Sequence, residues 1–270
     1  MKAYVKSVLF SAFPDISLRI FSARARRAIE LFCEQRGLTD HAVRMAAIDD
    51  NRVLQGPFKG MRIDYSALPV HTAPKYAGTY EKEIMAFVED AISEEPDRIL
   101  NVGSSDGYYA VGLALRIPNA TVFAAEADWK SERATERNAK LNGVDNRVIK
   151  AGIIHSGEFA QYLTPRRSLV IMDCEGAEFQ LLDPAQDPIL ALVNILVEIH
   201  EEHGQPNLII QRFASTHAAQ VVYETRRTTA DIPRQHDGSL SLDALDEYRR
   251  SQSWIYLKLK DGPETVRQKP

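Results

Sequence analysis

Short, almost wholly apolar runs alternate with amphipathic stretches along the chain from about residue 80 onward. Apolar runs of about 4–8 residues are typical of buried strands, and apolar positions at helical spacing are typical of helices. Apolar strands that alternate with helices predict an α/β fold, in which helices cover both faces of a mostly parallel sheet. We expect helices at 80–93, 107–116 and 129–142, and strands at 98–103, 121–126, 147–152, 168–174, 193–200, 220–226 and 254–260.

The sequence before this region has a different character. Residues 1 to about 50 carry apolar positions at helical spacing, as in ISLRIFSARARRAIELFCEQRG, and Gly37 supplies a helix stop. Two short apolar runs around Gly56 and Gly60 predict a β-hairpin or a paired turn. The sequence therefore predicts an N-terminal helical and hairpin extension over 1–75, an α/β domain over 76–262 and a frayed tail over 263–270.

The composition limits which binding partners and which cellular compartment we expect for the protein. The chain has 270 residues, 44% of them hydrophobic and 26% charged, and its formal charge of −4 gives no reason to expect nucleic acid or an anionic membrane as the main partner. Cys33 and Cys174 are far apart, which favours a reducing compartment over a disulfide framework. Pro14 and Asp15 break the apolar patch near the N-terminus, and no apolar run is long enough to span a membrane. We expect a cytoplasmic protein.

The stretch RILNVGSSDGYYA, residues 98–110, joins the first predicted strand of the domain to a helix. In an open parallel sheet, ligands bind at the carboxyl ends of the strands, where the strand order reverses. Glycines let the backbone approach a ligand, and the free amide groups at a helix N-terminus favour a negative group. The turn is therefore a candidate ligand loop, and the alternative is a tight connection that needs glycine only for packing. The loop residues are Gly103, Ser104, Ser105, Asp106 and Gly107.

A carboxylate at the end of the second predicted strand strengthens this interpretation. Glu126 ends the run TVFAAE, 23 positions after Gly103. An acid at this place in nucleotide-binding folds accepts hydrogen bonds from the ribose hydroxyls. A solvated acid at a strand end is the alternative.

The loop composition bears on which nucleoside the site would take. A dinucleotide fold prefers G-x-G-x-x-G, whose second glycine makes room for a pyrophosphate. Ser105 stands at that position, and Asp106 would face a phosphate at close range. An acid there suits a ligand with a cationic amino-acid end, such as S-adenosylmethionine, whose adenine would contact Ala127 and Ala151.

Several motifs in a fixed order resemble a known family. The stretch ILNVGSSDGYYAVGLA resembles motif I of class I methyltransferases, and the series GTYEKE, motif I, FAAEAD, NAKLNG, IMDCEGAE and VEIHE resembles the FkbM-type methyltransferases over residues 76–203. Asn101 departs from the pattern, because many class I methyltransferases have an acid there. The resemblance implies a Rossmann-like class I methyltransferase sheet. It also implies that Gly103, Ser105, Asp106 and Gly107 surround the methionyl part, with Glu126 on the ribose.

The same resemblance implies that Tyr80 and Glu81, in the GTYEKE stretch, reach the cofactor from the preceding segment. The alternative for this pair is a role at the start of a helix, with Thr79 as the N-cap.

Candidate catalytic residues follow the fourth and fifth predicted strands. Asp173 and Glu175 lie at the crevice end of a buried strand, whereas Glu178 in the next helical turn suits a structural role at the helix N-terminus. By strand alternation Glu198 and His200 share one face, and a histidine there is a candidate general base or a structural residue. Asp173, Glu198 and His200 could also gather a divalent cation, although we favour a site without metal.

The sequence therefore predicts an S-adenosylmethionine-dependent methyltransferase that acts by in-line transfer on a hydroxyl of a small molecule or a sugar. The 1–75 extension would cover the acceptor or form a homo-oligomer contact. One alternative is an NAD-dependent oxidoreductase on a similar sheet, and another is a non-catalytic nucleoside-binding module. We expect Asp173, Glu175 and His200 to be catalytic. The cofactor would be bound by Tyr80, Glu81, Gly103, Ser104, Ser105, Asp106, Gly107, Glu126, Ala127 and Asp173.

Overall fold

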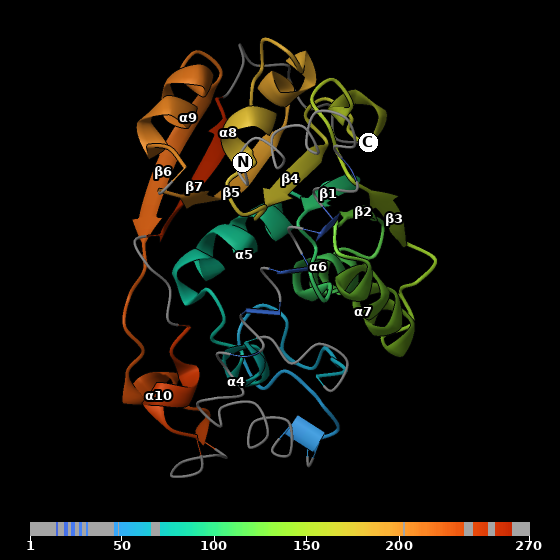
Figure 1. The fold of residues 1–270 in the computed structure, drawn as a ribbon, viewed down its shortest axis with the longest axis vertical. Coiled ribbons are helices and arrows are strands. Elements are labelled where there is room, and N and C mark those ends of the chain that lie inside the picture. Colours follow the sequence, from blue (N-terminus) through green and yellow to red (C-terminus); the bar gives the residue numbers. More distant parts are fainter. Residues whose placement is uncertain are drawn as a thin grey trace, which may run out of the picture.

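A seven-stranded sheet forms the centre of the molecule in the computed structural model (Figure 1). The structure describes residues 49–65, 71–201, 203–234, 240–247 and 252–260, together with isolated positions between 15 and 47. The strand order is β3-β2-β1-β4-β5-β7-β6. The strands are β1 (Arg98–Val102), β2 (Thr121–Ala125), β3 (Val148–Gly152), β4 (Ser168–Met172), β5 (Asn194–His200), β6 (His217–Tyr223) and β7 (Gln252–Leu259).

Six strands of the sheet run in one direction, and β7 runs in the opposite one. Strands β1 to β5 pair with one another in parallel, and β7 lies antiparallel between β5 and β6. The chain winds outward from β1 through β2 to β3 and then returns to place β4 on the other side of β1. The strand order therefore reverses between β1 and β4, which is where an open α/β sheet has its ligand crevice.

Apolar side chains cover both faces of the sheet. Successive residues of a strand point to opposite faces, so Ile99 joins one buried apolar cluster and Leu100 joins the other. The first cluster includes side chains of α5, α6 and α7, and the second includes side chains of α8 and α9. The helices are α4 (Thr72–Ala77), α5 (Met85–Ser93), α6 (Tyr108–Arg116), α7 (Trp129–Leu141), α8 (Glu178–Leu181), α9 (Pro206–Phe213) and α10 (Leu242–Leu245).

The predicted fold class is confirmed, and most predicted elements lie within two residues of the observed ones. The helix expected over 80–93 is an exception, because a 3-10 turn at Lys82–Ile84 precedes α5. Strand β6 also starts and ends three residues earlier than expected, at His217 and Tyr223. The buried His217 ring fixes this start through a 2.8 Å hydrogen bond between its Nε2 and the carbonyl oxygen of Val193.

The extension contributes to the same core as the sheet. The expected hairpin is an isolated antiparallel bridge between Arg52 and Arg62, and the buried side chains of Met61 and Tyr65 belong to the cluster that contains Ile99. Helix α4 crosses the expected boundary at residue 76, so the division into 1–75 and 76–262 stays a prediction. Most of the helix expected before residue 50, and the tail over 263–270, lie outside the described residues. Among the described helices, none is both long and apolar enough to cross a membrane.

Candidate functional site

The loop after β1 passes close to the loop after β4. Gly103 has a φ of 78°, and a Cβ atom added to it would lie 1.6 Å from the carbonyl oxygen of Asp173. The amide of Asp173 in turn donates to the carbonyl oxygen of Val102 over 3.0 Å. Because no side chain fits between these backbones, glycine at 103 is what brings the two loops to one edge of the sheet.

Glu126 ties the loop after β2 to the loop after β1. Its two carboxylate oxygens accept the backbone N–H groups of Ser105 over 2.8 Å and Asp128 over 2.7 Å. Burial raises the pKa of the Glu126 carboxyl above its ordinary value. Ser105, which donates to Glu126, has a left-handed backbone conformation with a φ of 49°. A glycine would adopt this conformation at no steric cost. Each oxygen of Glu126 keeps a second lone pair that can accept a hydroxyl.

Asp106 is buried beside a lysine that sequence reasoning missed. The ammonium of Lys75, in α4, lies 2.7 Å from Oδ2 of Asp106, and the two side chains are 3% and 2% exposed. The other oxygen of Asp106 accepts the N–H of Tyr108 over 3.2 Å. Lys75 lies 31 positions before Asp106, outside every motif, so the sequence carries no local signal for this pair.

Tyr80 and Glu81 reach this edge of the sheet from the segment after α4. The Tyr80 ring lies 5.3 Å from the Tyr108 ring, and the Tyr109 hydroxyl donates to the Glu81 carboxylate. The alternative role at a helix start is wrong in its detail, because Glu81 itself is the N-cap of the 3-10 turn, in a left-handed conformation with a φ of 47°. The Thr79 hydroxyl instead lies 3.5 Å from the carbonyl oxygen of Pro74.

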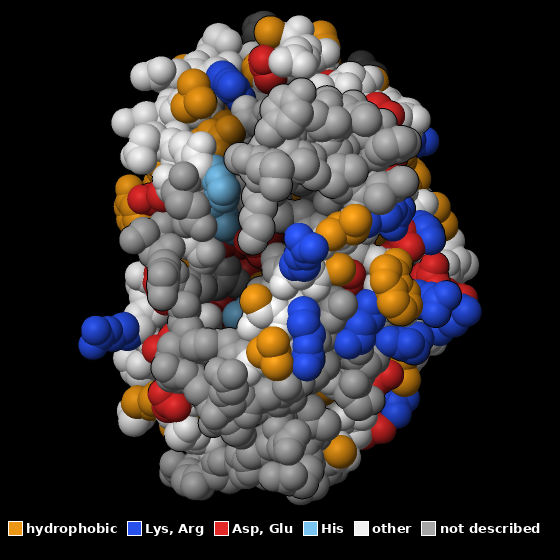
Figure 2. All heavy atoms as spheres, in the orientation of Figure 1, with side chains coloured by type: hydrophobic (Ala, Val, Ile, Leu, Met, Phe, Trp, Pro, Cys, Tyr) orange, Lys and Arg blue, Asp and Glu red, His pale blue; other side chains and the backbone are white. Residues whose placement is uncertain are grey.

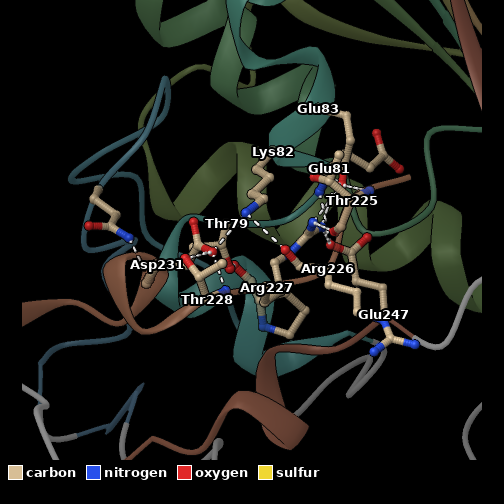
Figure 3. A network of polar contacts seen from close by, with 12 residues as sticks. Thr79, Glu81, Lys82, Glu83, Thr225, Arg226, Arg227, Thr228, Asp231 and Glu247 are labelled. Carbon is tan, nitrogen blue, oxygen red and sulfur yellow. Dashed lines mark hydrogen bonds and ion pairs between the residues drawn. The ribbon is translucent and has the colours of Figure 1, made fainter. Parts of the chain in front are cut away.

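A buried ionic network holds Glu81 in this conformation (Figure 3). The Glu247 carboxylate accepts the Glu81 N–H over 3.1 Å and also binds the Arg227 guanidinium. Arg227 reaches Glu83 over 2.5 Å, and the three charged side chains are 5% or less exposed. The segment after β6 and the segment after α10 are thereby fixed to the residues that surround Glu81.

A pocket, here called the β1–β4 pocket, lies between the carboxyl ends of β1, β4 and β5. Of the predicted cofactor ligands it is lined by Tyr80, Glu81, Gly103, Ser104, Ser105, Asp106 and Asp173. Six further polar or aromatic residues line the pocket and were not among the predicted cofactor ligands, namely Lys75, Asn101, Tyr108, Tyr109, Glu198 and Trp254. The predicted residues Gly107, Glu126, Ala127, Glu175 and His200 lie outside this lining.

The pocket is lined by more acidic than basic side chains. Four acidic side chains line it, and all except Asp173 are fully buried: Glu81, Asp106, Asp173 and Glu198. Lys75 is the single cation among the lining residues. Such a pocket favours a ligand with positive centres over one with a pyrophosphate.

His200 lies behind this pocket and is cationic. Its Nδ1 lies 3.1 Å from a carboxylate oxygen of Glu178, and its Nε2 lies 3.7 Å from Asp173 and 3.5 Å from Glu175. Burial lowers the pKa of the ring, but the hydrogen bond to Glu178 and the negative charges of Asp173 and Glu198 outweigh it and raise the pKa to about 10. At neutral pH the ring is therefore protonated and cannot accept a proton.

Glu178 has the structural role that the sequence favoured. Its side chain is 0% exposed and accepts the backbone N–H of His200 and of Gly176, each over 2.8 Å. Burial raises the pKa of Glu178, but its hydrogen bonds to His200 lower it below the ordinary value. Glu178 thus fixes the imidazolium, and the imidazolium in turn stabilises the loop that carries Asp173 and Glu175.

Among the residues that the structure describes, two groups of side chains could hold a cation. One is Asp173, Glu175 and His200, and the other is Glu81, Asp173 and Glu198, and within each group the ligand atoms lie within 4.8 Å of one another. The donor set that the sequence suggested, with Asp173, Glu198 and His200 together, is split between the two. Because His200 is protonated, the all-carboxylate group offers the better oxygen donors. Metal binding remains an alternative to the metal-free site that we favour.

Basic side chains gather outside the pocket, over α7 (Figure 2). The exposed side of this helix carries Lys130, Arg133, Arg137 and Lys140, and Trp129 at its start is 54% exposed with the Arg133 guanidinium 5.2 Å from its ring. The formal charge of −4 therefore does not describe this part of the surface. The expectation that neither nucleic acid nor a membrane is the partner stays a prediction.

Comparison with known proteins supports the architecture. No family model matches the sequence. The methyltransferase domain of METTL16 superposes with a TM-score of 0.52 at 11% identity, covering 85% of this chain and 99% of that domain. The chain has the class I methyltransferase fold. An O-methyltransferase of Bacillus cereus in complex with SAH is also similar, with a TM-score of 0.47 and 13% identity over 72% of this chain and 89% of that one.

A curated relative matches a short segment of the sequence. The release factor glutamine methyltransferase of Flavobacterium psychrophilum is 36% identical over 64 residues, which are 24% of this chain. The match spans only 22% of that relative, so it shows a shared segment and not a shared family.

Proposed function

We propose that the chain is a methyltransferase that uses S-adenosylmethionine at the β1–β4 pocket. The observation that carries the proposal is the charge of the pocket, with four carboxylates and one lysine at the point where the strand order reverses. A sulfonium and an ammonium are attracted by those carboxylates, whereas the pyrophosphate of NAD is repelled. The methyltransferase fold and the short match to a glutamine methyltransferase support the same conclusion.

The residues present suit that cofactor. Glu126 can accept the ribose hydroxyls, since its carboxylate is already oriented by two backbone N–H groups. Gly103, Ser104 and Ser105 would surround the methionyl part, with Tyr80 and Tyr108 as apolar walls. Ala127 and Gly107 flank this site without lining the pocket. The cofactor supplies the reactive methyl group, and the protein's part is to align the acceptor for in-line displacement and to take up its proton.

The acceptor that we propose is a hydroxyl on a small molecule or a glycan, as the FkbM-type resemblance implies. A hydroxyl needs a general base, and Asp173 is the half-exposed carboxylate of the pocket. His200 and Glu175 would act on the same step from behind, His200 by orienting the Asp173 carboxylate, which lies 3.7 Å from its Nε2. The 1–75 extension would cover the acceptor or form a homo-oligomer contact, and the Arg19 guanidinium already reaches the carbonyl oxygen of Ala127 over 3.2 Å.

Thermal-shift titration separates this function from its alternatives. We expect S-adenosylmethionine and S-adenosylhomocysteine to raise the midpoint of unfolding and NADH to leave it unchanged. Stabilisation by NADH alone would favour the oxidoreductase. Stabilisation by adenosyl ligands without methyl transfer to any acceptor in a broad screen with isotopically labelled methyl donor would favour a nucleoside-binding module. Loss of methyl transfer on addition of a chelator would favour the metal-dependent alternative.

A further inference from the structure

Lys75 is a buried lysine whose surroundings do not use its full hydrogen-bonding capacity. An ammonium has three N–H donors. Among the described residues, one carboxylate oxygen accepts from it, Oδ2 of Asp106 at 2.7 Å. The rings of Tyr80 and Tyr108 lie 5.0 and 6.0 Å from the ammonium and stabilise its charge through their faces. Within the described part of the chain, two donors of this buried cation therefore have no oxygen acceptor.

A purely structural role explains this pair poorly. A buried ion pair contributes little to stability unless further hydrogen bonds satisfy both partners, because removing two charges from water costs several kcal/mol per ion. Here the pair lines the pocket. Two neighbouring lining atoms also have no hydrogen-bond partner among the described residues, the side-chain oxygens of Asn101 and Ser104, on residues only 2% and 4% exposed. Unsatisfied polar atoms that gather at one wall of a pocket indicate a polar ligand group.

The pair has the charges that a zwitterion requires. An α-amino acid presents a carboxylate and an ammonium on one carbon, and Lys75 and Asp106 present the opposite charges side by side. Because Lys75 is the single cation among the lining residues, a carboxylate that enters this pocket has one charged partner there. The ammonium, in contrast, can pair with Asp106 and with the free oxygen of Asn101.

We infer that Lys75 binds the carboxylate at the amino-acid end of the methyl donor, while Asp106 and Asn101 bind its ammonium. The inference rests on the proposed function and adds a residue that selects among adenosyl sulfonium compounds. A donor without the carboxylate leaves Lys75 with its single protein partner and gains nothing from it. The site is therefore specific for S-adenosylmethionine over decarboxylated S-adenosylmethionine, which differs only in that group.

Calorimetric titration of the full chain with these two compounds tests the inference. We expect the wild type to bind S-adenosylmethionine about tenfold or more tightly than its decarboxylated form, the effect of one charge-assisted hydrogen bond. In Lys75→Met the two compounds should bind within about twofold of each other, since the substitution removes the charge and keeps the length of the side chain.

Two further variants make the result specific. Lys75→Met leaves Asp106 as an unpaired buried carboxylate, so Lys75→Met/Asp106→Asn supplies a neutral pair of nearly the same shape. The double variant should also lose the preference. Lys258→Met is the matched control: that ammonium lies 2.7 Å from Asp90 and 3.1 Å from Glu94, outside the pocket lining, and its loss should leave the preference intact.

The outcomes separate this inference from the proposed function. Equal binding of both sulfonium compounds by the wild type, or an unchanged preference in both Lys75 variants, would overturn the role of Lys75 and leave the methyltransferase standing. 5′-Methylthioadenosine, which lacks the amino-acid end, provides the second control. If it binds as tightly as S-adenosylmethionine, the adenosyl site holds and the amino-acid site is refuted. If the wild type binds none of the three compounds, the proposed function falls as well.

Discussion

Gly103 is the residue on which the geometry of the site depends most directly. Its replacement by alanine would place a methyl group on the carbonyl oxygen of Asp173, and backbone atoms on both loops would have to move. We expect Gly103→Ala to lower the free energy of unfolding by at least about 3 kcal/mol, or to prevent folding. Urea denaturation followed by circular dichroism measures this change.

Gly143 provides the control for Gly103, because it also has a left-handed φ, 67°, but a Cβ atom there would meet no atom within 4 Å. Gly143→Ala should therefore show only the cost of the left-handed backbone, about 1 kcal/mol. Similar losses for both variants would mean that the close approach of the two loops is not what requires glycine at 103.

The protonated His200 ring should make the free energy of unfolding decrease as the pH becomes alkaline. Its pKa in the folded chain is about 10, above the ordinary value of 6.5 in the unfolded chain. A raised pKa of this kind contributes stability fully below pH 6.5, and the contribution falls as pH rises through 10. The free energy of unfolding should thus decrease between pH 6.5 and 10, by up to about 5 kcal/mol.

His200→Gln tests that assignment, since glutamine keeps a hydrogen bond to Glu178 without the charge. The free energy of unfolding, measured by denaturation at each pH with a chelator present to remove metal ions, should change less with pH in this variant than in the wild type. An equally steep profile would assign the titration to another group. If His200 is nevertheless the general base for methyl transfer, activity should rise until the pH reaches about 10.

At the scale of elements, the segment after β6 is attached to the pocket through one arginine. Arg227 binds Glu83 and Glu247, and Glu247 holds the N–H of Glu81 (Figure 3). Replacing the arginine leaves two buried carboxylates without their partner. We expect Arg227→Met to cost about 3–5 kcal/mol of stability in urea denaturation and to weaken S-adenosylhomocysteine binding through the displaced Glu81.

Lys258→Met is the control for Arg227→Met, because it also removes a cation that pairs with two carboxylates. Its side chain and those of its partners Asp90 and Glu94 are 35–41% exposed, so the expected cost stays below about 1 kcal/mol. A similar small loss for Arg227→Met would show that Glu81 keeps its conformation without the network. Hydrogen exchange at the amides of 81–84 would report the same difference locally.

The elements were predictable where the local pattern is unambiguous. Apolar runs around Leu100, Val170 and Leu196 are buried on both faces, and such runs identify parallel strands without any knowledge of the fold. The start of β6 was not predictable, because it depends on the contact of His217 with Val193, 24 positions away. The 3-10 turn at Lys82–Ile84 likewise follows from the network around Arg227, which joins residues 144 positions apart.

The candidate site was also predictable only where its residues stand next to predicted strand ends. Gly103, Ser105 and Glu126 stand next to strand ends, and their joining at one edge follows from parallel pairing. Lys75 belongs to a helix before the domain, and its contact with Asp106 arises only in the folded chain. The protonation of His200 depends on Asp173 and Glu178 after β4 as well as on Glu198 of its own strand, so the residue type alone indicated a base where the structure has an acid.

For the whole molecule, the distribution of charge matters more than its sum. The formal charge of −4 combines an acidic pocket with a basic surface over α7 (Figure 2). The reversal of strand order between β1 and β4 places the acidic part where a ligand enters an α/β sheet. The proposed cationic methyl donor would therefore enter at this edge of the sheet.

One measurement tests the central claim most directly: calorimetric titration of S-adenosylhomocysteine into the wild type and into Glu126→Gln. We predict one site per chain in the wild type and binding weakened about tenfold or more in the variant, because glutamine loses the charged acceptor for the ribose hydroxyls. Asp183 is a partly buried acid outside the pocket, and Asp183→Asn should bind as the wild type does. Absence of binding by the wild type, or equal binding by Glu126→Gln, would contradict the account.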